Sequence, residues 1–255
     1  MNRIKLSPLS QLGFSSPKVK KLAELRKPQP SRTVAFDDHV HDLFDYTLFI
    51  PQHYEAKYAY PLLVWLHADG QDHRQVLKMM PHLSHRNYTA VSISSPFGDG
   101  CTSWLQDPVC IERTAERIEV AINHAKLRLN VDPERVFIVG CGSGGTMAMR
   151  VAFAFPNWFA GVISLNGEVP QDGQPLGSWT RCRNLPIFWA HARRSNRFGE
   201  CTLCQNLKLL HVAGFSLVLK QYPCGDSLDS QVFHDMNTWI METISDSSHS
   251  NSIVR

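Results

Sequence analysis

The sequence predicts an α/β protein with a doubly wound, mainly parallel sheet and helices on both faces. Short apolar runs alternate along the chain with segments of helical periodicity, which is typical of βαβ units. Several of these runs are apolar throughout, as expected for strands that are covered on both faces. The stretch RVFIVGCGSGGTMAMR (residues 135–150) also has the pattern of a buried strand, a glycine turn and a helix.

Length and composition indicate one large globular domain between two tails. The 255 residues are 43% hydrophobic and 19% charged, with a formal net charge of +3, and a chain of this size can bury a substantial core. Residues 1–33 are basic and carry four prolines, so we expect them to be disordered. We expect the α/β domain to occupy residues 34–245 and a disordered tail to occupy residues 246–255.

The first half of the domain is predicted to hold three strands and two helices. The strands are expected at residues 45–51, 61–67 and 88–95, the second of them in the apolar run PLLVWLH. A helix over residues 74–85 is expected to be interrupted at Pro81, because proline has no backbone N–H to donate. In residues 110–130, apolar side chains recur at spacings of three and four and make one helical face.

The second half continues the alternation of strands and helices. Strands are expected at residues 136–140, 161–167, 185–191 and 215–223, and helices at residues 146–155, 201–213 and 230–244. Functional loops of parallel sheets gather at the carboxyl ends of the strands. The positions to examine therefore follow His67, Ser95, Gly140, His191 and Pro223.

Four motifs resemble one enzyme family. They are PLLVWLHADGQD, NVDPERVFIVGCGSGGTMAMRVAFAFPNWFAGVISLNG, LPIFWAH and LKQYPCGDSL. With the order of the elements, they make residues 45–244 similar to α/β-hydrolases, in particular to the small phospholipase/carboxylesterase and feruloyl-esterase-like group. The resemblance implies the α/β-hydrolase fold. It also implies a serine, an aspartate and a histidine, in that chain order, acting on an ester or thioester carbonyl.

The nucleophile position of this family falls on Gly142. Aligning the glycine pair of the motif with Gly144 and Gly145 places the first glycine on Gly140 and leaves no side chain at the serine's place. A reading shifted by one residue would make Ser143 the nucleophile. A third alternative is that Ser143 caps the following helix.

The base position of the family falls on Asp226, in YPCGDSL. A carboxylate with a reference pKa of about 3.9 is a much weaker base than an imidazole near 6.5. His191, at the end of a strand, is a weak candidate for a replacement base, although a packing role is also expected of it. His234 lies well inside the last helix and is expected to be a surface or interface residue.

The acid position of the family falls on Arg194 and Ser195, in HARRSNRFGE. The nearest acid, Glu200, lies too far along the chain to be assumed equivalent. An ion pair between Arg194 and Asp226 would substitute structurally for the missing hydrogen bond between aspartate and histidine, and it requires the two groups to lie within about 6 Å.

The oxyanion loop of the family corresponds to WLHADG, with Ala68 in place of a glycine. Asp69 stands where the first N–H donor is expected, and Ser143 follows the vacant nucleophile position and would supply the second donor. A carboxylate at Asp69 opposes a developing negative charge unless it points to solvent.

Taken together, the departures at Gly142, Arg194/Ser195 and Asp226 predict a catalytically inactive or strongly impaired protein of this fold. Its expected role is to bind a small ester or acyl ligand, or a protein partner. The alternative is an active carboxylesterase or thioesterase that uses Ser143. Trp104, Phe97 and Trp189 could line an apolar cleft, although Trp189 is more simply a core residue.

Other classes of function have little support in the sequence. Cys201 and Cys204 have the spacing of a redox or zinc motif, but no second pair of ligands stands nearby, and we expect neither a metal nor a cofactor. The basic tail lacks the interleaved aromatic residues of nucleic-acid readers. No apolar run is long enough to span a membrane, and the scattered cysteines and the absence of an apolar signal segment favour a reduced, cytoplasmic protein.

Overall fold

The computed structural model describes residues 44–96, 103–170, 182–225 and 228–252. The chain divides into two units, Met1–Asp38 and His39–Arg255, and every described residue belongs to the second. The predicted tail at residues 1–33 and the predicted pocket residue Phe97 lie outside the described residues.

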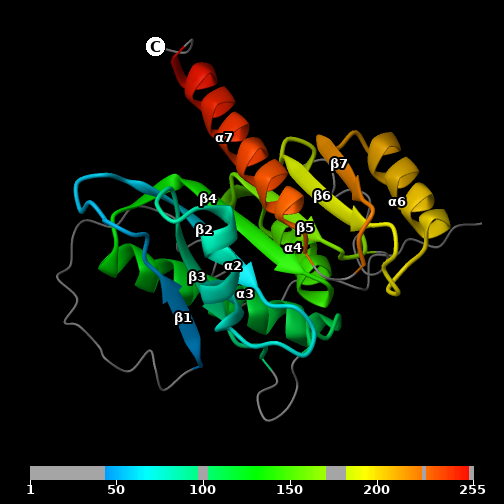
Figure 1. Ribbon diagram of the computed structural model, residues 1–255, viewed down its shortest axis with the longest axis horizontal. Helices are drawn as coiled ribbons and strands as arrows, with labels where there is room; N and C mark the ends of the chain where they lie inside the picture. Colours follow the sequence, from blue (N-terminus) through cyan, green and yellow to red (C-terminus); the bar gives the residue numbers. More distant parts are fainter. Residues whose placement is uncertain (1–43, 97–102, 171–181, 226–227, 253–255) are drawn as a thin grey trace, which may run out of the picture. The chain divides into compact units, whose positions relative to one another are not determined.

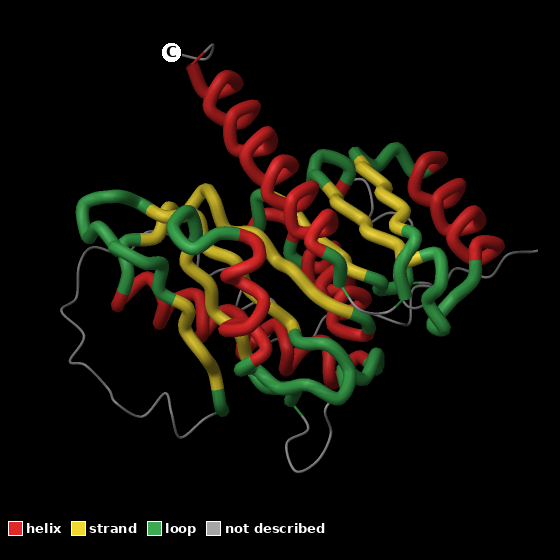
Figure 2. The backbone as a smooth tube through the Cα atoms, in the orientation of Figure 1, coloured by secondary structure: helices red, strands yellow, loops and turns green. Residues whose placement is uncertain are grey.

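Seven strands form one sheet in the order β1-β3-β2-β4-β5-β6-β7. Strand β1 pairs antiparallel with β3, and all the other pairs are parallel. Figure 2 shows the strands between the helices. The strands are β1 (Tyr46–Phe49), β2 (Tyr60–Leu66), β3 (Thr89–Ile93), β4 (Val131–Cys141), β5 (Gly161–Leu165), β6 (Ile187–Ala192) and β7 (Leu217–Tyr222).

Helices cover both faces of this sheet, which confirms the predicted fold class. Figure 1 shows α2 and α7 on one face and α3 and α4 on the other. The helices are α2 (Gln75–Leu83), α3 (Pro108–Arg128), α4 (Ser143–Ala154), α6 (Glu200–Val212) and α7 (Ser230–Ser252), with a 3-10 turn at Pro156–Trp158.

The core has two layers because successive strand residues point to opposite faces. On β2, Leu62 and Val64 pack into the layer under α3, α4 and α6. Leu63 and Trp65 pack into the layer under α2 and α7. All four side chains are fully buried, as the continuous apolar run PLLVWLH predicts.

Helix α3 begins as its sequence dictates. The side chain of Asp107 accepts a hydrogen bond from the backbone N–H of Cys110 at 3.0 Å. Pro108 occupies the first helical position, where a missing N–H costs nothing. These two residues fix the start of the helix that packs beneath β3.

Two predicted helix boundaries are corrected. Helix α2 runs through Pro81 without interruption. The proline deprives only the carbonyl of Leu77 of a partner, and Leu77 is 48% exposed, so water can hydrate that carbonyl. Helix α7 continues to Ser252, through residues expected to be a disordered tail, because residues 230–252 contain no proline or glycine to stop its propagation.

Strand β4 is also longer than predicted. It begins at Val131 rather than at residue 136 because Val131 pairs with Tyr60 across a register shift in β2. The carboxyl end of β4 lies between the ends of β2 and β5, with Gly140 paired to both Leu66 and Ser164. This edge of the sheet holds the glycine turn.

The central position of β4 leads to a stability prediction. Ile138 is fully buried in the core layer under α3 and α4, so Ile138→Ala should lower the free energy of unfolding by about 2–5 kcal/mol. Leu127→Ala is the control, because Leu127 on α3 is 71% exposed, and its effect should stay within about 0.5 kcal/mol. Urea titration measures both. Equal effects of the two variants would contradict the assignment of the core.

Candidate functional site

The turn after β4 places Gly142, not Ser143, in the unusual backbone conformation. Gly142 has φ +58° and ψ −123°, a region that glycine adopts far more easily than other residues. Its N–H donates to the carbonyl of Leu165 at 2.8 Å, and its carbonyl accepts from the N–H of Gly145 at 3.0 Å. The side chain projected from this turn would be that of residue 142, and there is none.

Helix α4 begins at Ser143, three residues earlier than predicted. The first turn of α4 can lie directly against the end of β4 because glycines stand on both sides of the contact. A Cβ on Gly140 would overlap the backbone of Gly144, and a Cβ on Gly144 would lie 2.6 Å from the carbonyl oxygen of His67. The glycines therefore form a close contact between helix and strand rather than a loop.

Ser143 makes its hydrogen bonds with a carboxylate instead of a histidine. Its hydroxyl donates to Asp69 Oδ1 at 2.5 Å and accepts from the N–H of Trp104 at 3.1 Å. Its own backbone N–H donates to Asp69 Oδ2 at 3.1 Å. Ser143 is also not a helix cap, since Gly142 holds the N-cap position.

Asp69 lies in the loop after β2 and points inward. Besides the two hydrogen bonds from Ser143, its carboxylate accepts a hydrogen bond from Ser103 Oγ at 2.6 Å and forms an ion pair with Arg197. Burial would raise the pKa of Asp69, but these hydrogen bonds outweigh it and hold the pKa well below its usual range. A negative charge therefore lies at the start of α4, where the helix dipole favours it.

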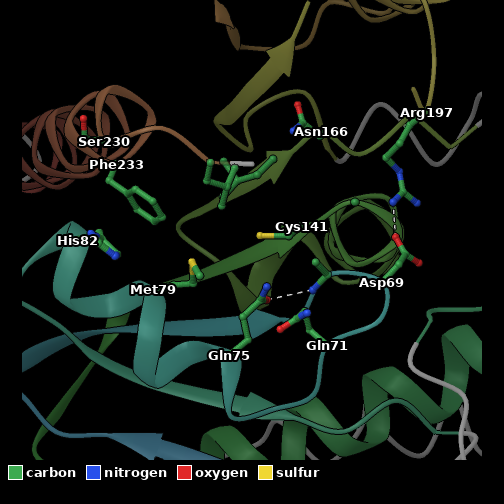
Figure 3. Close-up of a pocket in the computed structure, with 14 residues that line it drawn as sticks. Asp69, Gln71, Gln75, Met79, His82, Cys141, Asn166, Arg197, Ser230 and Phe233 are labelled. Carbon is green, nitrogen blue, oxygen red and sulfur yellow. Dashed lines mark hydrogen bonds and ion pairs between the residues drawn. The ribbon is translucent and has the colours of Figure 1, made fainter. Parts of the chain in front are cut away.

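Arg197 pairs with Asp69 (Figure 3), and its guanidinium lies close to Gly142. A Cβ built on Gly142 would lie 2.5 Å from Arg197 Nη1 and 2.8 Å from Asp69 Oδ2. The ion pair thus fills the space that a nucleophilic side chain would need. Sequence reasoning did not find Arg197, because it lies 128 residues from Asp69 along the chain.

His191 is buried on β6 as a core residue. It is 1% exposed, its ring centroid lies 4.7 Å from that of Phe198, and neither ring nitrogen has a hydrogen-bond partner among the described residues. Burial lowers the pKa of His191. Among the described residues, the hydrogen-bond partners of Ser143 include no histidine, and His234 is exposed on α7.

The loop after β6 carries the residues at the expected acid position. The N–H of Arg194 donates to the carbonyl of Cys224 at 3.0 Å, and Arg193 forms an ion pair with Glu200 at 3.3 Å. The hydroxyl of Ser195 accepts a hydrogen bond from the N–H of Arg197 at 3.2 Å. Asp226 lies outside the described residues, so its pairing with Arg194 stays a prediction.

A pocket of about 610 Å³ opens beside this turn, between α2, α7 and the ends of β4 and β5. In Figure 3, Asp69 and Arg197 lie at one end, while Met79 and Phe233 lie toward the other. The lining residues are Ala68, Asp69, Gln71, Gln75, Met79, His82, Cys141, Gly142, Leu165, Asn166, Arg197, Leu228, Ser230 and Phe233. His82 and Ser230 lie toward the same end as Met79 and Phe233, so that end combines apolar and polar side chains, whereas the end at the turn carries the ion pair.

Cys141 is a possible substitute nucleophile by position, since it lines the pocket directly before Gly142. Burial raises the pKa of the Cys141 thiol to about 12. At neutral pH the group is therefore a thiol rather than the reactive thiolate.

Trp104 and Trp189 are both buried, and their indole N–H groups donate to the backbone carbonyls of His67 and Gly167. They therefore anchor the segments after β2 and β5.

A second, smaller cavity lies on the other side of Arg197. It has about 260 Å³ and is lined by Gln106, Ser143, Thr146, Glu168 and Arg197. Ser143 thus faces this cavity and does not line the larger pocket.

Within the described residues, none of the helices is both long and apolar enough to cross a membrane.

Comparison with known proteins gives the following matches. A family model described as Phospholipase/Carboxylesterase matches residues 102–244, which is more than half of the chain. Carboxylesterase SOBER1 of Arabidopsis thaliana is 25% identical over 130 residues, covering 50% of this chain and 57% of that protein. Probable carboxylesterase SOBER1-like of the same plant is 23% identical over 133 residues, covering 51% of each. The chain thus spans about half the length of the curated relatives it matches.

Solved structures extend the likeness at the level of the fold. The crystal structure of Arabidopsis thaliana SOBER1 has a TM-score of 0.61 at 20% identity and covers 73% of this chain and 100% of that chain. The Bacillus cereus carboxylesterase has a TM-score of 0.64 at 12% identity and covers 80% and 97%. Both confirm the α/β-hydrolase fold.

The buried histidine leads to a prediction about pH. Because the pKa of His191 is lowered in the folded protein while that of the unfolded chain is about 6.5, the folded state resists protonation. The contribution of His191 to the free energy of unfolding should be fully present above pH 6.5. It should be lost as the pH falls from 6.5 through the pKa of the folded state. His67 and His73, whose pKa values burial also lowers, act in the same direction.

Urea unfolding at pH 7.5 and pH 5.5 measures this effect. His191→Leu should reduce the difference in unfolding free energy between the two pH values. His234→Leu, at an exposed position on α7, should leave it unchanged. A pH difference that is the same in His191→Leu and in the unmodified protein would show that His191 does not titrate on unfolding.

Proposed function

Since the chain belongs to the phospholipase/carboxylesterase family, we propose that it is a non-catalytic member that binds a small ester or acyl ligand in the pocket beside Gly142. The observation that carries this proposal is the ion pair of Asp69 and Arg197 over Gly142. A serine hydrolase needs an exposed hydroxyl at this turn, and here the turn has no side chain, while Arg197 and Asp69 occupy the space in front of it.

We further propose a cytoplasmic location, which the free described cysteines support.

The oxyanion site supports the same proposal. Ester hydrolysis needs backbone N–H groups that are ready to receive a developing negative charge. The N–H of Ser143 already donates to Asp69, and a second anion would have to approach this carboxylate. Repulsion between the two charges would raise the energy of the transition state rather than lower it.

The charged state of Asp69 also argues against hydrolysis by Ser143. Its hydroxyl donates to Asp69, whose pKa is held well below the usual range by its hydrogen bonds. A carboxylate that is so stabilised in its charged form has little tendency to take a proton. Hydrolysis through Ser143, the alternative function, would require the hydroxyl either to pass its proton to Asp69 or to give up this hydrogen bond.

The shape of the pocket favours an acyl ligand over a protein partner. Met79, Leu165 and Phe233 give the pocket an apolar wall, and its volume of about 610 Å³ suits a small molecule. Near the turn, Gln71 and Asn166 offer amide groups that can bond to an ester or acyl oxygen. An acyl chain along the apolar wall with its carbonyl toward these amides uses both ends of the pocket.

The first test of this proposal is ester turnover. With p-nitrophenyl butyrate the purified protein should release product no faster than buffer alone, and Ser143→Ala should behave in the same way. Gly142→Ser should also fail to hydrolyse the ester, because among the described residues its side chain would meet Arg197 and Asp69 rather than a histidine. Loss of a measurable turnover on changing Ser143 to alanine would instead establish Ser143 as the nucleophile.

The second test is binding. Ethyl hexanoate should bind, as followed by saturation-transfer NMR, and Met79→Trp should weaken it by filling the apolar end of the pocket. Leu77→Trp is the matched control, since Leu77 lies on the same helix, is 48% exposed and does not line the pocket. Equal binding in both variants would place the ligand elsewhere, and no binding to the unmodified protein would refute an acyl ester as the ligand.

A further inference from the structure

The first five residues of α6 include two cysteines, Cys201 and Cys204, that the proposed function does not use. Cys201 and Cys204 are both exposed and both free. The other described cysteines are buried or half-buried: Cys110, Cys141, Cys182 and Cys224. Solutes therefore reach this pair more readily than any other described thiols.

The spacing of the pair suits a short intramolecular bond. Residues three apart on a helix lie on the same face, with Cβ atoms about 5–6 Å apart, whereas a disulfide needs about 3.5–4.5 Å. Cys201 is the second residue of α6, where backbone N–H groups have no acceptor within the helix. Gly199 precedes the helix, and a Cβ added to it would have no atom within 4 Å, so the chain there has space to move. The first turn can therefore tighten by the required distance without breaking the helical ladder.

The fold places the pair near the start of the helix that follows β6, after a loop at residues 193–199. Helix α6 follows β6, which pairs parallel with both of its neighbours. A Cys-x-x-Cys pair at the start of a helix in a strand–helix unit is the setting in which such dithiols exchange with disulfides. The Cys-x-x-Cys spacing therefore occurs together with exposure of both thiols and a position near the start of a helix.

A metal site is the competing interpretation. Structural zinc takes four ligands in a closed shell. Across the described part of the chain, no group of three or more His, Cys, Asp or Glu side chains could hold a metal ion. Glu200, the acid beside Cys201, is instead paired with Arg193. The surroundings therefore favour thiol–disulfide chemistry.

We propose that Cys201 and Cys204 form a reversible dithiol–disulfide centre that reacts with low-molecular-weight disulfides such as oxidised glutathione. One cysteine, as thiolate, attacks a sulfur of the small disulfide; one glutathione leaves as a thiol and the other stays on the protein as a mixed disulfide. The second cysteine attacks the protein sulfur of that bond and releases the second glutathione. The protein dithiol loses two electrons and two protons, and the small disulfide becomes two thiols.

This centre is separate from the pocket. Phe198, between Arg197 and Gly199, is buried and packs on His191 and Trp189, with ring-centroid distances of 4.7 and 6.2 Å. This anchor holds the loop that carries Arg197 while the first turn of α6 changes. The redox proposal therefore does not depend on the proposed ligand or on the loss of ester hydrolysis.

The test equilibrates the full chain with glutathione buffers of defined thiol-to-disulfide ratio, followed by acid quenching, alkylation and peptide mapping by mass spectrometry. We expect one transition in which the peptide carrying both cysteines becomes lighter by two hydrogen atoms and escapes alkylation. Addition of dithiothreitol should restore both alkylation sites.

Variants at these exposed positions identify the bond. Cys201→Ser and Cys204→Ser should each lose the intramolecular disulfide and stop at a mixed disulfide with glutathione on the remaining cysteine. Cys224→Ser, at a half-buried position, should keep the transition of the unmodified protein. The proposal is overturned if the unmodified protein stops at mixed disulfides, bonds either cysteine to a different one, or stays alkylated at every ratio.

Discussion

The carboxylate of Asp69 joins four segments that are far apart in the chain. It comes from the loop after β2 and receives bonds from Ser103, from both the backbone and the hydroxyl of Ser143, and from Arg197 in the loop after β6. The remaining features of the site depend on this convergence. With Asp69 pointing inward, the start of α4 already binds an anion, and Arg197 is held over Gly142.

The fold holds this turn in place through the backbone alone. Parallel strands bring the ends of β2, β4 and β5 to one edge of the sheet, and the close contact of Gly140 with Gly144 fixes the turn between them. Neither constraint involves a catalytic side chain. The turn therefore persists with glycine at position 142, and an internal ion pair can occupy the space above it.

The sequence predicted most of the framework because burial on both faces leaves continuous apolar runs. From the register of the glycine pair, the family resemblance also pointed to Gly142, which is the residue with positive φ in the turn. The sequence could not give the direction of Asp69 or the presence of Arg197, because both depend on a contact across 128 residues. Local rules also misjudged Pro81 and the end of α7, where the solvent-facing carbonyl of Leu77 and the absence of helix breakers decide the outcome.

The central claim is that this turn carries no reactive nucleophile, and labelling with a fluorophosphonate probe tests it most directly. Such a probe reacts covalently with serines that a neighbouring base activates. After reaction, digestion and mass spectrometry, the account predicts no adduct in the peptide that contains Gly142 and Ser143. A stoichiometric adduct on Ser143 would contradict it, because it would mean that Asp69 activates this hydroxyl instead of holding it.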